Sequence, residues 1–374
     1  MFTFPIRLAF APEPLGLAYN CSVCFTVSPS TLGSHAMRRL FLVIAILLPV
    51  SAQNSSFEAG LTLYRNGKLP EALERFKESE QASEVSPLRQ FYRGVCLAKL
   101  GQWGPASASL SNYLESYPAD PHGWFWLSRV QLLQKDYSGA HVSIQRAIAI
   151  GPASSETKRV LGEIELELGQ NQLAYEAWIE AHRLDPLDAQ TTYHLGRLFF
   201  EAEFFKEAAD WLRDTLRLVP AHFSALTYLA LCAEHLGDEP TAIRLYKQAI
   251  AQSKSQKAPF AWAYVSYAKL LRQSGNDKEA LFVLEESARL APDASALAIL
   301  GQILQDRGER DRAERAYRRG IQLDPNVSVL HYRLSLLLRS GGRVEEAQRE
   351  SDLFSRAKKA EEAARTAVSA IRKE

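Results

Sequence analysis

The chain has 374 residues, of which 47% are apolar and 23% charged, with a formal net charge of +1 at pH 7. Residues 1–52 contain three arginines and one glutamate, so the remainder has 41 basic and 42 acidic residues. A net charge near zero with no basic stripe argues against a nucleic-acid-binding protein, which needs a positive surface.

Residues 37–53, "MRRLFLVIAILLPVSAQ", have the order of a secretory signal: two arginines, an apolar run and small residues at the cleavage point. The apolar stretch from Leu40 to Val50 is too short for a membrane span, which needs about 20 residues. We therefore expect a cleaved signal peptide over 37–52 and an exported protein, either periplasmic or secreted. No cysteine lies at the cleavage point, so a lipid anchor is not indicated.

A signal peptide should begin a chain, and the only methionines are Met1 and Met37. We therefore expect translation to start at Met37, with residues 1–36 an over-extended, disordered start. The CxxC pair Cys21 and Cys24 would then be absent from the mature protein. Outside a strand-helix context, that pair is weak evidence for a redox or metal site.

A unit of about 34 residues repeats through the rest of the chain. Its marker is an alanine that recurs at intervals of 33 to 38: Ala72, Ala106, Ala140, Ala174, Ala208, Ala242, Ala280, Ala313 and Ala347. Twelve residues earlier is another small residue: Gly60, Gly94, Ser128, Gly162, Gly196, Ala230, Ala268, Gly301 and Ser335. Small residues on two successive helices let the pair pack closely.

The ends of the two helices are also marked. Seven units have a glycine five residues before the alanine, where the first helix must stop. Eight have a large apolar or aromatic residue four positions after the alanine, and six have a proline twelve positions after it, which ends the second helix. Each unit is therefore predicted to be a helix, a tight turn and a second helix.

These units resemble tetratricopeptide repeats of an exported, bacterial-type protein. The family pattern is met almost in full by "LGQILQDRGERDRAERAYRRGIQLDP", residues 300–325. Nine units cover 53–360. The resemblance implies an all-α fold, a right-handed α-solenoid of about nine helix-turn-helix repeats.

Two units depart from the pattern. The sixth lacks its proline and is followed by "SKSQKAP", which predicts a longer loop at which the stack bends or flexes. The ninth has Ser351 where the large residue belongs, and a helical spacing of apolar residues continues behind it. Terminal units need a polar outer face, so we interpret 361–374 as a C-terminal capping helix.

No residue pattern indicates catalysis, a metal or a cofactor. His182 and His194 straddle a turn, but their spacing fits no compact ligand set, and the glycines lie at repeat turns rather than in a phosphate loop. Cys96 and Cys232 occupy corresponding positions four units apart, too far for a disulfide, and should be buried thiols. We expect a protein that is not an enzyme.

The resemblance implies that the first helices line a concave groove, with residues 15, 11 and 8 before the marker alanine facing it. The candidate groove residues are Phe57, Tyr64, Phe91, Phe125, Arg129, Arg159, Tyr193, Arg197, Phe200, Lys269, Arg272 and Tyr332. The lysine and asparagine clamp with which some family members hold a chaperone's C-terminal carboxylate is absent. Packing between neighbouring first helices is an equally good explanation of the aromatic residues.

Two functions remain open. The first is an exported adaptor that binds a protein or peptide in its groove, with no nucleic acid and no stable membrane span. The second is a scaffold that self-associates into homo-oligomers. A third interpretation makes the chain an accessory subunit of an envelope enzyme such as a glycosyltransferase.

We expect N-terminal sequencing of the exported protein to begin at Gln53, because cleavage after Ala52 follows the small-residue rule. Mass spectrometry of the same material should yield no peptide from residues 1–36. Recovery of such a peptide would contradict the start at Met37.

Overall fold

The computed structural model describes residues 56–79 and 87–371, in which every regular element is a helix. The chain divides into two compact units, one up to Ala153 and one from Ser154. The expectations for residues 1–36, for the signal peptide and for Cys21 and Cys24 lie outside the described residues.

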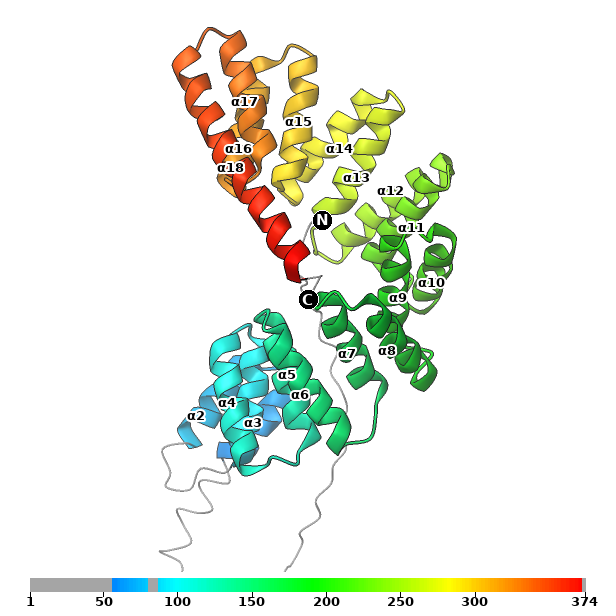
Figure 1. Cartoon of the computed structure of the whole chain (residues 1–374), viewed down its shortest axis with the longest axis vertical. Helices are drawn as coiled ribbons and strands as arrows, with labels where there is room; N and C mark the ends of the chain where they lie inside the picture. Colours follow the sequence, from blue (N-terminus) through cyan, green and yellow to red (C-terminus); the bar gives the residue numbers. More distant parts are fainter. Residues whose placement is uncertain (1–55, 80–86, 372–374) are drawn as a thin grey trace, which may run out of the picture. The chain divides into compact units, whose positions relative to one another are not determined.

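The first unit contains three helix pairs (Figure 1). They are a helix over 56–65 with α2 (Leu69–Glu78), α3 (Pro87–Lys99) with α4 (Trp103–Ser116), and α5 (Pro121–Leu133) with α6 (Tyr137–Ile150).

The second unit contains six pairs. They are α7 (Ser155–Glu167) with α8 (Asn171–Leu184), α9 (Ala189–Glu201) with α10 (Phe205–Leu218), α11 (Phe223–His235) with α12 (Glu239–Ser255), α13 (Ala261–Gln273) with α14 (Asp277–Leu290), α15 (Ala294–Asp306) with α16 (Arg310–Leu323), and α17 (Ser328–Ser340) with α18 (Val344–Ile371). Within each unit the described helices have the all-α, helix-turn-helix solenoid architecture that the repeats predict.

The turn inside each pair requires a left-handed residue. The seven turn glycines named by the repeat have φ between 72° and 80°. The third and fifth pairs lack the glycine, and Lys135 and Glu203 occupy the same conformation there, with φ of 65° and 64°. The conformation is therefore imposed by the repeat even where the side chain disfavours it.

Close packing within a pair depends on the small residues. All nine marker alanines are completely buried. In the fourth pair a Cβ at Gly162 would lie 2.4 Å from Nε1 of Trp178, and at Gly301 it would lie 2.4 Å from the Tyr317 ring. The small residue thus makes room for the large side chain four positions after the alanine.

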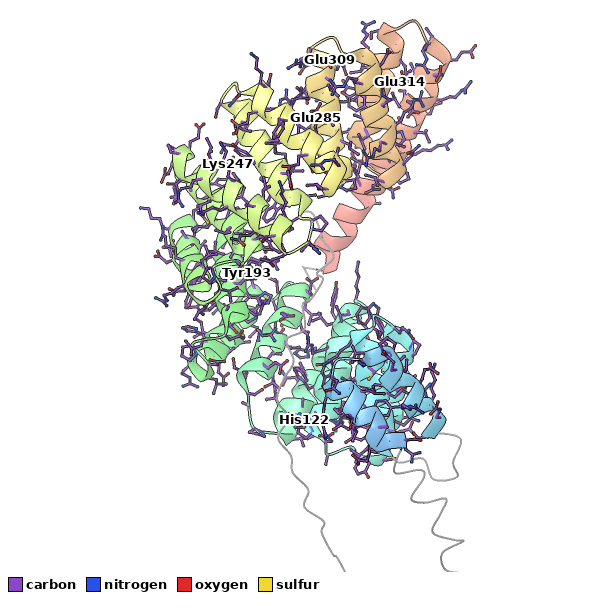
Figure 2. The ribbon with its side chains drawn as sticks, turned by 180° about the vertical axis from the view of Figure 1, so that it is seen from behind. His122, Tyr193, Lys247, Glu285, Glu309 and Glu314 are labelled. Atoms are coloured by element: carbon purple, nitrogen blue, oxygen red, sulfur yellow. The ribbon has the colours of Figure 1, made fainter. Side chains whose placement is uncertain are left out.

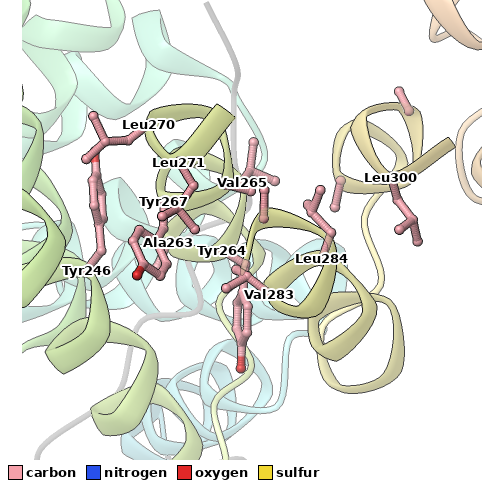
Figure 3. Close-up of a cluster of buried hydrophobic side chains, with 14 of the residues drawn as sticks. Tyr246, Ala263, Tyr264, Val265, Tyr267, Leu270, Leu271, Val283, Leu284 and Leu300 are labelled. Carbon is pink, nitrogen blue, oxygen red and sulfur yellow. The ribbon is translucent and has the colours of Figure 1, made fainter. Parts of the chain in front are cut away.

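Buried apolar side chains run through each unit along the interface between first and second helices. Figure 3 shows the part around Tyr246 of α12, with Tyr264 and Tyr267 of α13 and Leu284 of α14. Two of the large tyrosines four positions after the marker alanine find acceptors: Tyr246 donates to Glu234 at 2.9 Å and Tyr317 to Gln305 at 3.0 Å. In both pairs the acceptor lies on the first helix, twelve residues before the tyrosine.

The two thiols expected to be buried are both free and fully buried. Burial raises the pKa of both Cys96 and Cys232 to about 12. They therefore remain protonated at neutral pH.

The junction after the sixth unit differs from the expected loop. Most second helices of the internal pairs have 14 residues, whereas α12 has 17. Most of the inserted residues extend the helix, which ends at Ser255, and Lys257 just beyond it has a φ of 52°. Gln256 then donates from Nε2 to the carbonyl of Ala221, 2.6 Å away, and this bond ties the extension to the start of its own repeat.

The ninth pair ends in one long helix. The segment interpreted as a capping helix, 361–374, is described as far as Ile371 and continues α18 without a break. Glu361 accepts hydrogen bonds from the backbone N–H and the hydroxyl of Ser328, at 2.9 and 3.0 Å. His331 contacts Glu350 at 2.7 Å, so two points of α18 are held to the first turn of α17.

We expect Lys135→Gly and Glu203→Gly each to stabilise the protein by about 1 kcal/mol, because glycine removes the cost of the left-handed conformation. The measurement is the midpoint of urea unfolding followed by circular dichroism. The control is Gln134→Gly, at a neighbouring residue with a right-handed φ of −78°, which should lower the midpoint. Equal effects at residues 134 and 135 would contradict the explanation.

Candidate functional site

In both units, the first helices of successive pairs contact one another. Such contacts join α3 to α5 in the first unit and α9, α11, α13, α15 and α17 in the second. Among the described residues, second helices of successive pairs make no contacts of this extent. Each stack therefore curves toward its first helices, which line its concave side.

In the first unit, most of the candidate aromatic residues pack inside. Phe91 and Phe125 are buried, 9% and 7% exposed. Phe57 packs against the buried ring of Phe76, with 5.8 Å between ring centroids. Phe57 thus contacts α2, and the ring of Phe91 contacts that of Tyr113 of α4, with 5.2 Å between centroids.

Tyr64 and Arg129 take part in a cluster of cations and aromatic rings. Lys99 Nζ donates to the Tyr64 hydroxyl at 3.3 Å and lies 5.6 Å from the centre of the Trp126 ring. The Arg129 guanidinium lies 5.1 Å from the same ring. The sequence spacing found Tyr64 and Arg129 but missed Lys99 and Trp126.

In the second unit, Arg159 is surrounded by carboxylates. Its guanidinium lies 2.7 Å from Glu163, 3.2 Å from Asp188 and 3.8 Å from Glu156. Burial lowers the pKa of Arg159, but attraction to these carboxylates outweighs it and the net shift is upward. Because Asp188 caps α9, Arg159 braces α7 against the next repeat.

Three other candidates lie together on α9, and two residues of the next first helices join them. Arg197 lies 6.0 Å from the centres of the Tyr193 and Tyr228 rings. The Tyr228 ring is 5.3 Å from Phe200 and 4.7 Å from Trp262, measured between centroids. We call Tyr193, Arg197, Phe200, Tyr228 and Trp262 the α9–α13 strip; all five are partly buried. Figure 2 labels Tyr193 within the second unit.

The charge of the strip is fixed at neutral pH. Burial raises the pKa of Tyr193 and of Tyr228, and Arg197 only partly offsets this, so both phenols stay neutral. For Arg197, burial lowers the pKa but the tyrosines and Glu201 raise it further. The strip therefore presents one permanent cation among neutral rings.

Arg197 has hydrogen-bonding capacity left. A guanidinium has five N–H donors. Its one carboxylate partner, Glu201, is 3.3 Å from a terminal nitrogen, and Nε is buried with no hydrogen-bond partner among the described residues. About a fifth of the side chain, 21%, is exposed.

The remaining candidates lie further along the second unit. Lys269 is exposed and has no ion-pair partner within the described part of the chain. Arg272 lies 3.4 Å from both Asp277 and Asp306. Tyr332 is 45% exposed and, with Phe354, lines an open hollow of about 320 Å³.

Sequence spacing missed Tyr228 and Trp262, which lie 14 and 18 residues before their marker alanines. The groove prediction covers only the residues 15, 11 and 8 positions before each marker alanine. On a helix, positions three or four residues apart share nearly the same face, and 14 and 18 each lie three residues before a groove position. A search for aromatic residues one turn upstream would have found Trp262.

The described residues contain no group of three or more histidine, cysteine or acidic residues arranged to hold a metal ion. None of their helices combines the length and apolar character needed to cross a bilayer.

The repeat geometry agrees with the comparison with protein families. A family model described as tetratricopeptide repeat matches residues 97–155, 159–221, 193–261 and 299–373, together more than half of the chain. The chain belongs to the tetratricopeptide repeat family.

Similar tetratricopeptide proteins include subunits of large assemblies. Anaphase-promoting complex subunit 3 of Schizosaccharomyces pombe is 24% identical over 273 residues, 71% of this chain and 40% of that protein. BBSome complex member BBS4 of Bos taurus is 23% identical over 311 residues, 83% of this chain and 59% of that protein. The chain thus spans about half the length of these two relatives.

A solved structure shows the same fold. A tetratricopeptide repeat protein from Parabacteroides merdae is superposed with a TM-score of 0.53 at 18% identity, over 68% of this chain and all of that chain.

We expect Arg159→Met to destabilise the protein by about 2–4 kcal/mol, because it leaves partly buried carboxylates without their cation. Lys269→Met removes an exposed lysine without an ion pair and should change stability by less than about 0.5 kcal/mol. Urea unfolding of both variants measures the difference. Similar stability of the two variants would show that Arg159 does not brace the repeat junction.

Proposed function

We propose that the protein is a non-enzymatic adaptor that binds a segment of a partner protein along the first helices of its second unit. The observation that carries this is the α9–α13 strip. Arginine, tyrosine and tryptophan dominate binding hot spots because they combine large contact area with directional bonds. Here all three lie on successive first helices and remain partly exposed.

The relatives support an adaptor role. The names of two of them place them in multi-subunit complexes, the anaphase-promoting complex and the BBSome. Repeats that stack side by side create extended concave surfaces suited to such assembly.

We also propose that the protein acts after export, in the periplasm or outside the cell. The support is the signal-peptide pattern at 37–52. In this location the partner would be a protein of the cell envelope. A role as accessory subunit of an envelope enzyme is one form of this adaptor function.

Self-association is the second candidate function, and one observation favours it. At the end of the array, Val329 and Tyr332 of α17 are 40% and 45% exposed. No further helix pair covers this face among the described residues. Light scattering after size-exclusion chromatography tests it: a monomer at micromolar concentration would argue against a scaffold of identical copies.

The adaptor proposal is tested by Tyr228→Leu, which keeps an apolar side chain but removes the ring from the centre of the strip. Affinity capture from envelope extract, quantified by mass spectrometry, should retain a partner with the wild-type chain and lose most of it with this variant. The matched control is Phe282→Leu on the second helix α14, where the ring is 67% exposed and outside the strip.

The control should capture the partner as the wild type does. Circular dichroism must show that both variants remain folded. If Tyr228→Leu retains the same partners in the same amounts, the strip is not the binding site.

A further inference from the structure

The turns inside the fourth, fifth and sixth helix pairs carry an excess of acidic residues. Each turn with its flanking helix ends spans from nine residues before the marker alanine to two after it, which gives 165–176, 199–210 and 233–244. We call these three stretches the acidic rim. They contain ten acidic and two basic residues, whereas the corresponding stretches of the last three pairs contain eight acidic and nine basic.

Most carboxylates of the acidic rim have no cationic partner. Glu201 lies 3.3 Å from Arg197, and Asp210 lies 2.5 Å from Arg213. Six others are exposed and make no ion pair within the described residues: Glu167, Glu176, Glu203, Glu207, Asp238 and Glu239. The hydrogen bonds that some of them accept come from uncharged groups, as from the Ser274 hydroxyl to Glu239, and leave the negative charge in place.

Exposed apolar side chains lie among these carboxylates. Phe204, in the turn of the fifth pair, is 56% exposed, and Leu173 and Leu236 are each 45% exposed. The ring of Phe199 links two neighbouring pairs, with its centroid 5.9 Å from that of Tyr175 and 6.3 Å from that of Phe204. Aromatic contacts therefore run along the acidic rim from α8 to the start of α10.

The next pair continues this surface. The rings of Phe205 and His235 stack with 4.2 Å between centroids, which joins the start of α10 to the end of α11. α7 to α12 follow one another along the second unit (Figure 1), so the three turns belong to successive pairs of one stack.

A hollow of about 150 Å³ opens beside the turn of the sixth pair. Its lining includes apolar Leu229 and Ala233, Leu236 and Asp238 of the acidic rim, and Arg213 and Arg244. An apolar cavity of about this size accepts a group as large as benzene, so the hollow admits one apolar side chain. It lies between the second helices α10 and α12, whereas the concave side is lined by first helices.

We propose that the acidic rim binds a basic segment of a partner protein, whose apolar side chains pack on Phe204 and in the hollow beside Leu236. The Lys or Arg side chains of this segment pair with the exposed carboxylates. Complementary charge speeds encounter and fixes the orientation of the partner. The acidic rim is separate from the α9–α13 strip, so this inference goes beyond the proposed function.

The charge and the rings together determine the chemistry of the occupant. A negative surface repels nucleic acids and anionic lipid headgroups. Lys and Arg side chains can pair with the carboxylates and can also lie against the face of an exposed ring such as Phe204. A polypeptide segment that combines these cations with an apolar side chain satisfies both features.

The test is selection from a displayed library of short random peptides on the immobilised full-length chain. The library is first depleted on the Phe204→Ser variant, so that peptides bound elsewhere are removed. Peptides then enriched on the wild-type chain should contain two or more Lys or Arg residues and at least one large apolar residue. Their binding should weaken as salt is raised, because exposed charges are screened.

Variants of the chain assign the contacts of a selected peptide. Phe204→Ser should weaken binding about tenfold or more, as for a central aromatic contact. Glu203→Gln and Glu207→Gln should each weaken it about two- to fivefold, as for an exposed ion pair. Because both carboxylates are exposed, these two variants remain informative even if Phe204→Ser perturbs the fold.

Matched controls come from pairs whose turns are balanced in charge. Phe282→Ser removes a ring that is 67% exposed on α14, and Asp311→Asn removes an exposed carboxylate on α16. Neither should change the affinity. Tyr228→Leu should also leave it unchanged, because Tyr228 belongs to the α9–α13 strip.

The other outcomes would contradict the proposal. Enriched peptides without basic residues, or no enrichment above background, would overturn it. Equal weakening by Tyr228→Leu and Phe204→Ser would show that the acidic rim is not a separate site. A dimer that light scattering detects for the wild type but not for Phe204→Ser would identify a second copy as the occupant. Loss of partner capture through the strip is measured independently, so either proposal can fail alone.

Discussion

The structure depends on the close approach of two helices at a small residue that faces a large one. In the fourth pair, the Trp178 ring occupies the space where a Cβ of Gly162 would lie, and its Nε1 donates to the carbonyl of Arg159 at 3.0 Å. The glycine exposes the backbone, the ring fills the gap, and the hydrogen bond satisfies the buried indole N–H. Each helix of a pair is short and would be marginal alone, so this contact is what makes the pair a unit.

The same constraint divides the repeats into two kinds. Where the large residue is tyrosine, its hydroxyl uses an acceptor on the first helix, as with Tyr246 and Glu234 or Tyr317 and Gln305. That acceptor occupies a groove position and is then committed to packing. In the fifth pair the large residue is Leu212, which requires no acceptor, and the equivalent position holds Phe200. The strip thus begins at a repeat whose large residue, Leu212, requires no acceptor from the first helix.

Sequence periodicity was sufficient to predict the helix pairs, their turns and the buried alanines, because each of these is set by residues within one repeat. It was also sufficient to place Tyr193, Arg197 and Phe200 on one face. It failed where contacts between neighbouring repeats decide which side chains meet. Nothing in the local sequence shows that Arg159 meets Asp188 of the next repeat, or that Tyr228 meets Trp262, 34 residues on. The insertion after the sixth unit was read as a loop, although its residues, "SKSQK", are compatible with continuing α12.

Arg159 and Arg197 show why residue type alone does not define a binding site. Both are arginines on neighbouring first helices, and in both the charge is partly withdrawn from water. Around Arg159 three carboxylates compensate the lost hydration, so an additional anion would gain little there and would be repelled by its neighbours. Around Arg197 there is one carboxylate, Glu201, at 3.3 Å, and the rings of Tyr193 and Tyr228 supply the other contacts, each with its centre 6.0 Å from the guanidinium. One repeat therefore holds its arginine in a network of carboxylates, whereas the arginine of the next repeat lies among aromatic rings with a single carboxylate beside it.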